Sequence, residues 1–353
     1  IAATHIGGTT IHSWSGIGIR RVIDEHDIFS MQNNRFILER IASIDVLIVD
    51  EISMLDSVMI DNLDYVLRGV RGKDLPFGGV QVVFVGDFFQ LPPVSREKTV
   101  QLKFAFESSA WQQIGFRVCY LTEQHRQEDM EFLEILTAMR NGTTTAAHKE
   151  RLTRCMMSEM PETQLYTHNL DVDKVNLRSL AQLPGDMETF KGKSSGVPIL
   201  VEMLKKDCLS PEILMLRVGA VVMFTCNDFE NGYVNGTIGT VVKFDSSGRP
   251  VVQKKGTDRY ITVELHEWTR EEKKRVVASF QQFPLRLAWA ITVHKSQGMS
   301  LDSASVDLSK TFEYGQGYVA ISRVRSLAGL HLQGINSKAF EMHPKVVEQD
   351  KIF

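Results

Sequence analysis

Short apolar runs, rich in β-branched residues and each leading into polar or charged residues, recur along the chain. Four segments have this form: Asp45–Asp50, Val80–Asp87, Leu285–Val293 and Ala304–Leu308. Runs that are apolar at successive positions are typical of strands in a parallel sheet that helices cover on both faces. The pattern therefore predicts four buried strands.

Elsewhere, the apolar residues recur at the three- to four-residue spacing of an amphipathic helix. We expect one helix over Leu55–Leu67, with Gly69 just beyond its end. A second helix is expected over Phe132–Met139, where Asn141-Gly142 supplies a stop. Strands and helices that alternate on this scale indicate an α/β architecture.

Residues 219–283 follow a different pattern. Short β-rich pieces are separated there by Asn-Gly, Gly-x-x-Gly and Ser-Ser-Gly-Arg-Pro turns. This spacing predicts a small antiparallel barrel inserted into the second α/β domain. We interpret the charged run Thr269–Arg275 as a solvated face, and a role in tracking DNA is the alternative.

Length and composition narrow the class of protein. A chain of 353 residues suits two domains, or two domains and an insertion. No apolar run approaches the ~18 residues that a membrane span requires. The net charge of −3 argues against a surface coated in positive charge, so contacts with nucleic acid would be local and would rely partly on stacking.

The cysteines lie apart, without a C-x-x-C pair. Their spacing favours neither a disulfide framework nor a zinc site, and it suits a reducing compartment. They are Cys119, Cys155, Cys208 and Cys226.

Acidic and amide side chains follow the first two predicted strands. Asp50 and Glu51 stand at the end of one strand, and Asp87 and Gln90 stand at the end of the next. Open parallel sheets place ligands at this edge, where an aspartate can hold Mg²⁺ and a neighbouring glutamate can orient or deprotonate water. A glutamine amide both donates and accepts hydrogen bonds, which suits contact with a terminal phosphate. A strand that merely ends in an acidic turn is the alternative.

Two arginines and a polar cluster are further candidates for contacts with phosphate groups. Arg126 lies just after a predicted strand, and Arg323 lies in YVAISRVRS; a planar guanidinium can bridge γ-phosphate oxygens, and surface salt bridges are the alternative. Thr292, His294 and Lys295 follow another strand and offer donors suited to a phosphate backbone. His294 has no second ligand at the spacing of a metal site.

Together these residues resemble the Pif family of DNA helicases, which belongs to superfamily 1B and is related to RecD. The resemblance covers essentially the whole chain, in the family's motif order. IGGTTIHSWSGIG resembles motif Ia, VDEISMLD motif II, GDFFQLPPV motif III, EQHRQ motif IV, LAWAITVHKSQG motif V and YVAISRVRS motif VI. DSVMIDNLDYVLRGVRGKDLPFGGVQ, between motifs II and III, resembles the family's signature region.

The resemblance implies an α/β fold with two RecA-like P-loop NTPase domains, each built on a parallel sheet. Domain 1A would span residues 1–122, and domain 2A would span residues 123–218 and 284–353. Residues 219–283 would form domain 2B, an inserted β-barrel of the Src-homology-3 kind.

The resemblance also implies roles for individual residues. Asp50 would coordinate Mg²⁺, and Glu51 would act as the catalytic base. Gln90 would contact the γ-phosphate, Gly298 would approach the nucleotide, and both Arg126 and Arg323 would act as arginine fingers. The residues expected to grip single-stranded DNA are Thr10, His12, Ser13, Pro92, Pro93, Val94, Thr292, His294 and Lys295.

The implied activity is ATP-dependent, Mg²⁺-dependent translocation from 5′ to 3′ along single-stranded DNA, with unwinding of forked or structured DNA. Domain closure on ATP and release on hydrolysis would link the two sites, so DNA should stimulate hydrolysis. The family's processes are DNA repair, recombination and telomere maintenance. We expect a monomer without a membrane partner, in the bacterial cytoplasm, or in the nucleus or mitochondrion of a eukaryote.

One family motif is absent from the sequence: no G-x-x-x-x-G-K-[ST] string occurs. That loop cradles phosphates with its backbone amides, and its lysine and hydroxyl bind phosphate oxygens and Mg²⁺. Because the chain opens with Ile1 inside motif Ia, we interpret it as a fragment of a longer helicase, and a naturally shortened product is the alternative. We expect the chain alone to hydrolyse ATP poorly and its first sheet to expose apolar surface.

Two other functions remain open at the level of the sequence. One is an ATP-independent DNA-binding or regulatory module, which would have no use for Asp50, Glu51, Gln90, Arg126 and Arg323. The other is the motor subunit of a RecD-like nuclease complex, although no nuclease-type acidic cluster is visible.

Overall fold

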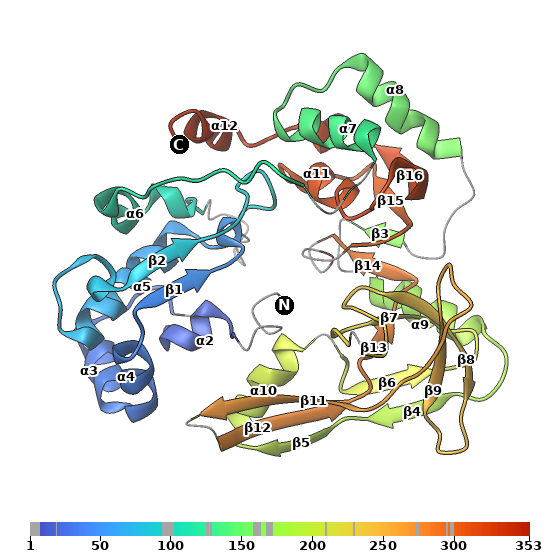
Figure 1. Cartoon of the computed structure of the whole chain (residues 1–353), viewed down its shortest axis with the longest axis horizontal. Helices are drawn as coiled ribbons and strands as arrows, with labels where there is room; N and C mark the ends of the chain where they lie inside the picture. Colours follow the sequence, from blue (N-terminus) through green and yellow to red (C-terminus); the bar gives the residue numbers. More distant parts are fainter. Residues whose placement is uncertain are drawn as a thin grey trace. The chain divides into compact units, whose positions relative to one another are not determined.

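The computed structural model describes residues 8–18, 20–93, 102–124, 127, 129–157, 164–166, 172–208, 210–228, 230–272, 275–293, 296 and 300–353 (Figure 1). Side chains at positions 203, 206, 207, 271, 272 and 275 are outside the description. The chain divides into two compact units. The N unit comprises residues 2–123, 313–315 and 341–353, and the C unit comprises residues 124–312 and 316–340.

The N unit is built on two parallel strands, β1 (Val46–Val49) and β2 (Gln81–Phe84). The side chains of Leu47, Val49 and Val82 enter a core that the neighbouring helices complete. The helices of this unit are α2 (Ile11–Ser15), α3 (Glu25–Asn33), α4 (Arg35–Ala42), α5 (Ser57–Arg71), α6 (Ser109–Ile114) and α12 (Pro344–Asp350).

Helix α5 forms the centre of that core. Asp56 begins the helix by accepting a hydrogen bond from the Met59 amide, and buried residues such as Leu63 recur along one face. The sequence predicts a helix that ends before Gly69, and the structure differs from this prediction. It continues to Gly72, whose φ of +62° supplies the left-handed C-cap, while Gly69 lies inside the helix against Ile28.

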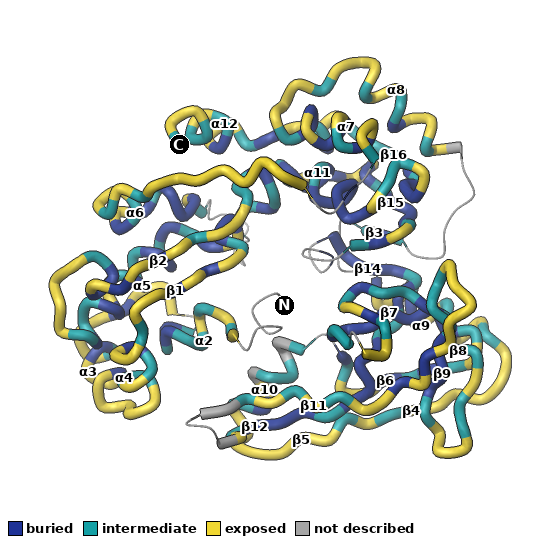
Figure 2. The backbone as a smooth tube through the Cα atoms, viewed as in Figure 1, coloured by how far each residue is buried: buried dark blue, intermediate teal, exposed yellow. Residues whose placement is uncertain are grey.

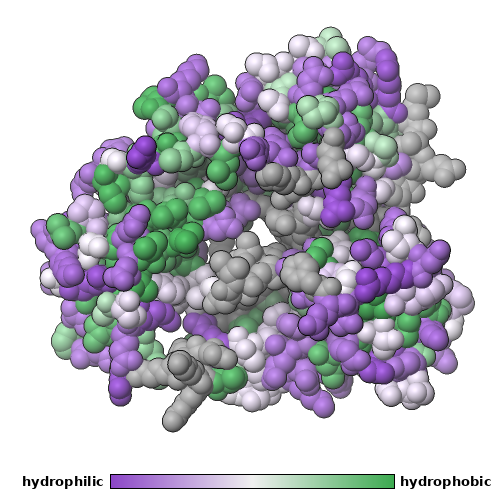
Figure 3. Space-filling view, viewed as in Figure 1, coloured by the Kyte–Doolittle hydropathy of each residue, from purple (hydrophilic) through white to green (hydrophobic). Residues whose placement is uncertain are grey.

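The opposite face of β1 and β2 is exposed. Val46 is 47% exposed, Ile48 66% and Val83 37%. Figure 2 shows exposed positions along both strands, and Figure 3 shows hydrophobic side chains gathered over them. The prediction that these two strands are buried on both faces is therefore wrong. The exposed face agrees with the apolar surface expected of a first sheet that lacks a P-loop strand.

The C unit contains a second parallel sheet, and this confirms the α/β class. Its strand order is β14-β3-β15-β16, and all three neighbouring pairs are parallel. These strands are β14 (Ala290–Thr292), β3 (Gln164–Tyr166), β15 (Ala304–Leu308) and β16 (Leu330–Ile335). The helices of this unit are α7 (Met130–Arg140), α8 (Ala146–Arg154), α9 (Val172–Gln182), α10 (Pro198–Asp207) and α11 (Gln316–Ile321).

Antiparallel strands occupy the segment where the sequence predicts an inserted barrel, although they begin earlier, at residue 188. The main sheet has the order β10 (Tyr260–Thr262), β9 (Pro250–Lys254), β8 (Ile238–Phe244), β7 (Val221–Phe224) and β13 (Leu285–Leu287). Smaller sheets contain β11 (His266–Glu272), β12 (Arg275–Gln282) and β5 (Lys193–Gly196), and β4 (Glu188–Lys191) and β6 (Ile213–Leu216). A Src-homology-3-like barrel remains a prediction. The charged run Thr269–Arg275 lies in β11, β12 and the residues between them.

The segment Leu285–Val293 is not one strand. Its first part is β13, which pairs antiparallel with β7, and its second part is β14, which pairs parallel with β3. Asn176 holds the second part in place, because its side chain bonds both the N–H and the carbonyl of Ala290, each at 2.9 Å. A continuous apolar pattern therefore spans two sheets.

The end of the chain joins the N unit, whereas the sequence analysis assigns residues 284–353 to the second domain. Lys345 forms an ion pair with Glu107 at 2.7 Å. The ring of Phe353 lies 6.2 Å from that of Phe88 and 6.0 Å from that of Trp111, centroid to centroid. Aromatic packing thus anchors this segment. In the part of the chain that the structure describes, no helix has the length and apolar character of a membrane span.

This anchoring can be tested by replacing Phe353 with alanine. We expect Phe353→Ala to lower the free energy of unfolding by about 1–3 kcal/mol, below the roughly 3–5 kcal/mol of a fully buried aromatic ring. Ile352→Ala is the matched control, because Ile352 is 76% exposed. Urea denaturation measures both variants. Equal stability losses in the two variants would contradict the packing of Phe353.

Candidate functional site

Acidic residues follow β1 at the carboxyl edge of the sheet. Asp50 is exposed, and its Oδ1 accepts a hydrogen bond from the Glu51 amide at 2.9 Å. Glu51 itself has φ +54° and ψ +47°, a left-handed conformation that is uncommon outside glycine. Backbone strain of this kind clusters at functional sites, where the surrounding structure holds it in place.

The loop after β2 lies against the loop after β1. The Ile52 amide donates to the Val85 carbonyl at 3.0 Å, which joins the two loops directly. Gly86 makes the approach possible, because a Cβ there would lie 2.9 Å from the Ile52 nitrogen. The structure therefore brings the pair Asp50 and Glu51 and the following loop of Asp87 and Gln90 to one sheet edge, as the sequence predicts.

The second loop is ordered by hydrogen bonds among its own residues. Asp87 accepts from the Phe89 amide through Oδ1 at 3.2 Å, and its carbonyl accepts from the Gln90 amide at 3.0 Å. Gly315 packs on this turn: its φ is +71°, and a Cβ there would lie 2.9 Å from the Gln90 carbonyl oxygen and still closer to that of Phe89. Sequence reasoning missed Gly315, whose partners lie far away along the chain.

The carboxylates of this edge suit one part of a Mg²⁺ site. Among the described residues, no group of three or more His, Cys, Asp or Glu side chains could hold a metal ion. Mg²⁺ bound with a nucleotide usually takes one or two carboxylates and completes its shell with phosphate oxygens and water. The exposed carboxylate of Asp50 fits that requirement.

Arg323 lies just after α11 and is buried, with 2% exposure. Its Nε donates to the Val319 carbonyl at 2.9 Å, and Nη2 donates to the Ser322 hydroxyl at 2.9 Å. Gln127, 6% exposed, donates from Nε2 to the Ser322 carbonyl at 3.0 Å and to the Val324 carbonyl at 3.3 Å. Gln127, which follows Arg126 in the sequence, thus contacts the segment of Arg323. Arg126 and Gly298 themselves lie outside the described residues.

The residues predicted to bind DNA lie in separate segments of the chain, and the structure describes some of them. Thr10 is exposed and precedes α2, which contains His12 and Ser13. Desolvation lowers the pKa of His12 below its ordinary value, and the nearby charge of Asp56 acts in the opposite direction.

The remaining DNA-face residues are only partly described. Pro92 and Pro93 are half-buried, and Thr292, at the end of β14, is 1% exposed. Val94, His294 and Lys295 lie outside the described residues. The roles of all these residues in DNA binding remain predictions.

Two α/β units with parallel sheets, one of them carrying acidic and amide side chains at its carboxyl edge, define a protein of the RecA-like class. Comparisons with known proteins narrow this class. A profile described as PIF1-like helicase matches residues 1–150. The ATP-dependent DNA helicase Pif1 of a Psychrobacter species is 40% identical over 417 residues, which cover 100% of this chain and 63% of that protein.

Solved structures of Pif1 helicases are also similar to this chain. A Bacteroides Pif1 in complex with ADP-AlF4 has a TM-score of 0.86 and 32% identity, over 100% of this chain and 85% of that one. A Bacteroides Pif1 with ADP-AlF3 and single-stranded DNA has a TM-score of 0.64 and 31% identity, with the same coverage. The chain belongs to the PIF1-like helicase family. It spans less than two thirds of the length of its Psychrobacter relative.

The close approach of Gly315 to the second loop can be tested with alanine. Gly248 is the matched control, because its φ of +78° is close to the +71° of Gly315, but a Cβ there meets nothing within 4 Å. We expect Gly248→Ala to cost about 1–2 kcal/mol of stability, the penalty for a left-handed residue with a Cβ. Gly315→Ala should cost more, because the Gln90 backbone must also move.

The measurements are urea denaturation and hydrogen exchange of residues 86–91. We expect faster exchange in Gly315→Ala alone. Identical stability losses and unchanged exchange in both variants would show that Gly315 does not support this loop.

Proposed function

We propose that the chain is the motor portion of an ATP-dependent DNA helicase that moves 5′ to 3′ along single-stranded DNA. The observation that carries this proposal is the junction of the loops after β1 and β2, which gathers Asp50, Glu51, Asp87 and Gln90 at one sheet edge. The printed name of the Psychrobacter relative and the nucleotide and DNA complexes of the Bacteroides proteins support it.

The N unit would supply the groups that handle water and the terminal phosphate. The strained backbone of Glu51 fixes the start of its side chain, whose carboxylate would accept a proton from the attacking water. Gln90 would contact the γ-phosphate, since its amide can donate to a phosphate oxygen and accept from water. Asp50 would hold Mg²⁺, which neutralises charge on the phosphate oxygens when bound.

The C unit would supply positive charge. Arg126 and Arg323 would act as arginine fingers on the phosphate, and Gly298 would lie beside the nucleotide. Arg323 is buried, and it donates to Val319 and Ser322 of its own segment. We infer that this guanidinium must turn outward to meet a nucleotide.

DNA would be held by the residues of motifs Ia, III and V. Thr10, His12 and Ser13 would bond the backbone of the strand, and Pro92, Pro93 and Val94 would give a fixed apolar surface for it. Thr292, His294 and Lys295 would complete the grip from the C unit. Because contacts of this kind depend on phosphate charge, binding should weaken as salt rises.

The test is ATP turnover with and without single-stranded DNA, on two proteins. One is the chain of 353 residues, and the other is that chain extended upstream with a strand, a phosphate-binding loop of the form G-x-x-x-x-G-K-[ST] and a helix. We expect strong turnover, stimulated by DNA, only in the extended protein. The phosphates need the backbone amides and the lysine of that loop.

Glu51→Gln in the extended protein is the control. Removal of a general base should lower turnover by about 10²- to 10⁴-fold, while ATP and DNA still bind. Unwinding of substrates with a 5′ or a 3′ single-stranded tail then reports the direction of movement. If neither protein turns over ATP while both still bind DNA, the proposed motor function is wrong and the ATP-independent DNA-binding module is favoured.

A further inference from the structure

A buried amide joins two segments of the C unit that lie far apart in sequence. The side chain of Gln127 donates from one nitrogen to the carbonyls of Ser322 and Val324, at 3.0 and 3.3 Å. These carbonyls stand immediately before and after Arg323. An amide nitrogen carries two N–H donors, so a single glutamine can satisfy both carbonyls at once.

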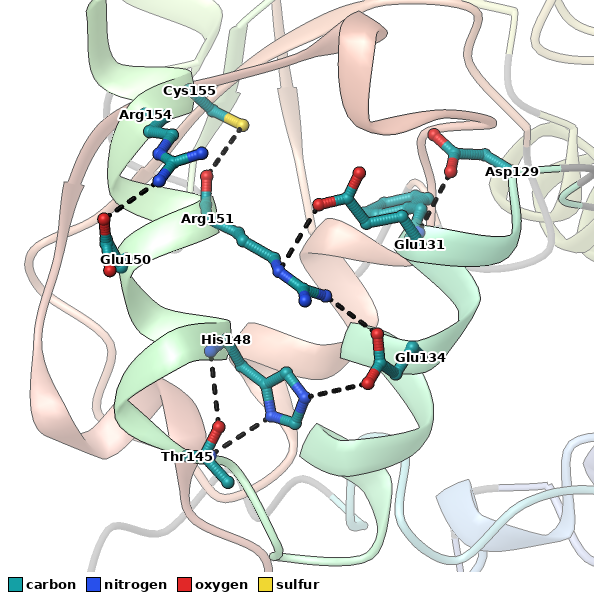
Figure 4. Close-up of polar contacts among 10 residues, drawn as sticks. Asp129, Glu131, Glu134, Thr145, His148, Glu150, Arg151, Arg154 and Cys155 are labelled. Carbon is teal, nitrogen blue, oxygen red and sulfur yellow. Dashed lines mark hydrogen bonds and ion pairs between the residues drawn. The ribbon is translucent and has the colours of Figure 1, made fainter.

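A second link lies two residues further along the same segment. Asp129 accepts from the Leu327 amide through Oδ2 at 2.9 Å and from the Phe132 amide through Oδ1 at 3.1 Å. The second of these bonds caps α7. Figure 4 shows Asp129 at the start of α7, and further along that helix Glu131 and Glu134 pair with Arg151 of α8. The segment of Gln127 is thus tied to a helix with a fixed beginning.

The backbone of Arg323 has another partner, Leu301. The Leu301 amide donates to the Arg323 carbonyl at 2.7 Å, and the Arg325 amide donates to the Leu301 carbonyl at 3.0 Å. Gln127 binds the carbonyls on either side of Arg323, and Leu301 binds the carbonyl of Arg323 itself. Three successive carbonyls therefore have fixed partners, and the backbone that carries this arginine is held along its length.

We propose that Gln127 is a positioning residue for turnover, which holds the backbone that carries Arg323 in place. This inference rests on the proposed function, in which Arg323 acts on the phosphate. A charge that is misplaced by about 1 Å can lower a rate by roughly a hundredfold while substrate binding remains.

The test compares Gln127→Glu with Gln282→Glu. Both glutamines are buried, and Gln282 also donates from Nε2 to backbone carbonyls, those of Phe190, Pro211 and Glu212, at 3.0, 3.3 and 3.2 Å. An ionised glutamate has no donor and a protonated one has a single O–H, so each change removes at least one of the two N–H donors of the amide. Should either glutamate variant fail to fold, Gln127→Met and Gln282→Met remove the donors without adding charge.

The first measurement is hydrogen exchange of residues 320–327 in the chain of 353 residues, without nucleotide. We expect faster exchange of the Arg325 amide in Gln127→Glu and no change in Gln282→Glu. The second measurement is kcat and KM for ATP in the extended protein, with DNA present. We expect kcat to fall about tenfold or more in Gln127→Glu, at a KM within about twofold, and to stay near the parent value in Gln282→Glu.

The outcomes separate the two proposals. Unchanged exchange in Gln127→Glu, or an equal loss of kcat in both variants, would overturn the role of Gln127. Absence of turnover in the unmutated extended protein would count against the proposed function alone. In that case the exchange measurement still decides whether Gln127 holds the segment of Arg323.

Discussion

The hydrogen bond from the Ile52 amide to the Val85 carbonyl is the contact on which the candidate nucleotide edge depends. It extends the pairing of β1 and β2 past the ends of both strands, so the two loops leave the sheet together. Only a glycine at position 86 allows the backbones to come this close. Asp50, Glu51, Asp87 and Gln90 therefore share one edge because the backbones of the two loops pack together.

In the C unit, side-chain hydrogen bonds help to fix the segment that contains Arg323. Arg323 is buried, which would be costly for a charge without partners, and its guanidinium donates to a carbonyl and a hydroxyl of its own segment. The adjoining carbonyls are bound by Gln127, and the Arg323 carbonyl is bound by the Leu301 amide. The backbone that carries Arg323 is therefore held by contacts that do not involve its guanidinium.

Local pattern predicted the parts of the fold that local forces determine. The strand over Ala304–Leu308 and the acidic ends of the first two strands follow from apolar runs and their borders. The segment Leu285–Val293 belongs to two sheets instead of one strand, because most of its residues are apolar and no Gly or Pro in the sequence marks the break. Gln127 could not be found in this way. Its partners lie about two hundred positions further along the chain, and nothing in its neighbourhood distinguishes it from a surface glutamine.

Gly315 packs on the loop after β2 and directly precedes α11. Its contact with the carbonyls of Phe89 and Gln90 lies within the N unit, yet the next residue, Gln316, begins α11 in the C unit, and that helix leads to Arg323. No free space remains between Gly315 and these carbonyls, so the backbone immediately before α11 is packed closely against the Gln90 loop. From Gly315 the chain reaches Arg323 in nine residues, with the packing contact to Phe89 and Gln90 at one end and the Gln127 amide at the other.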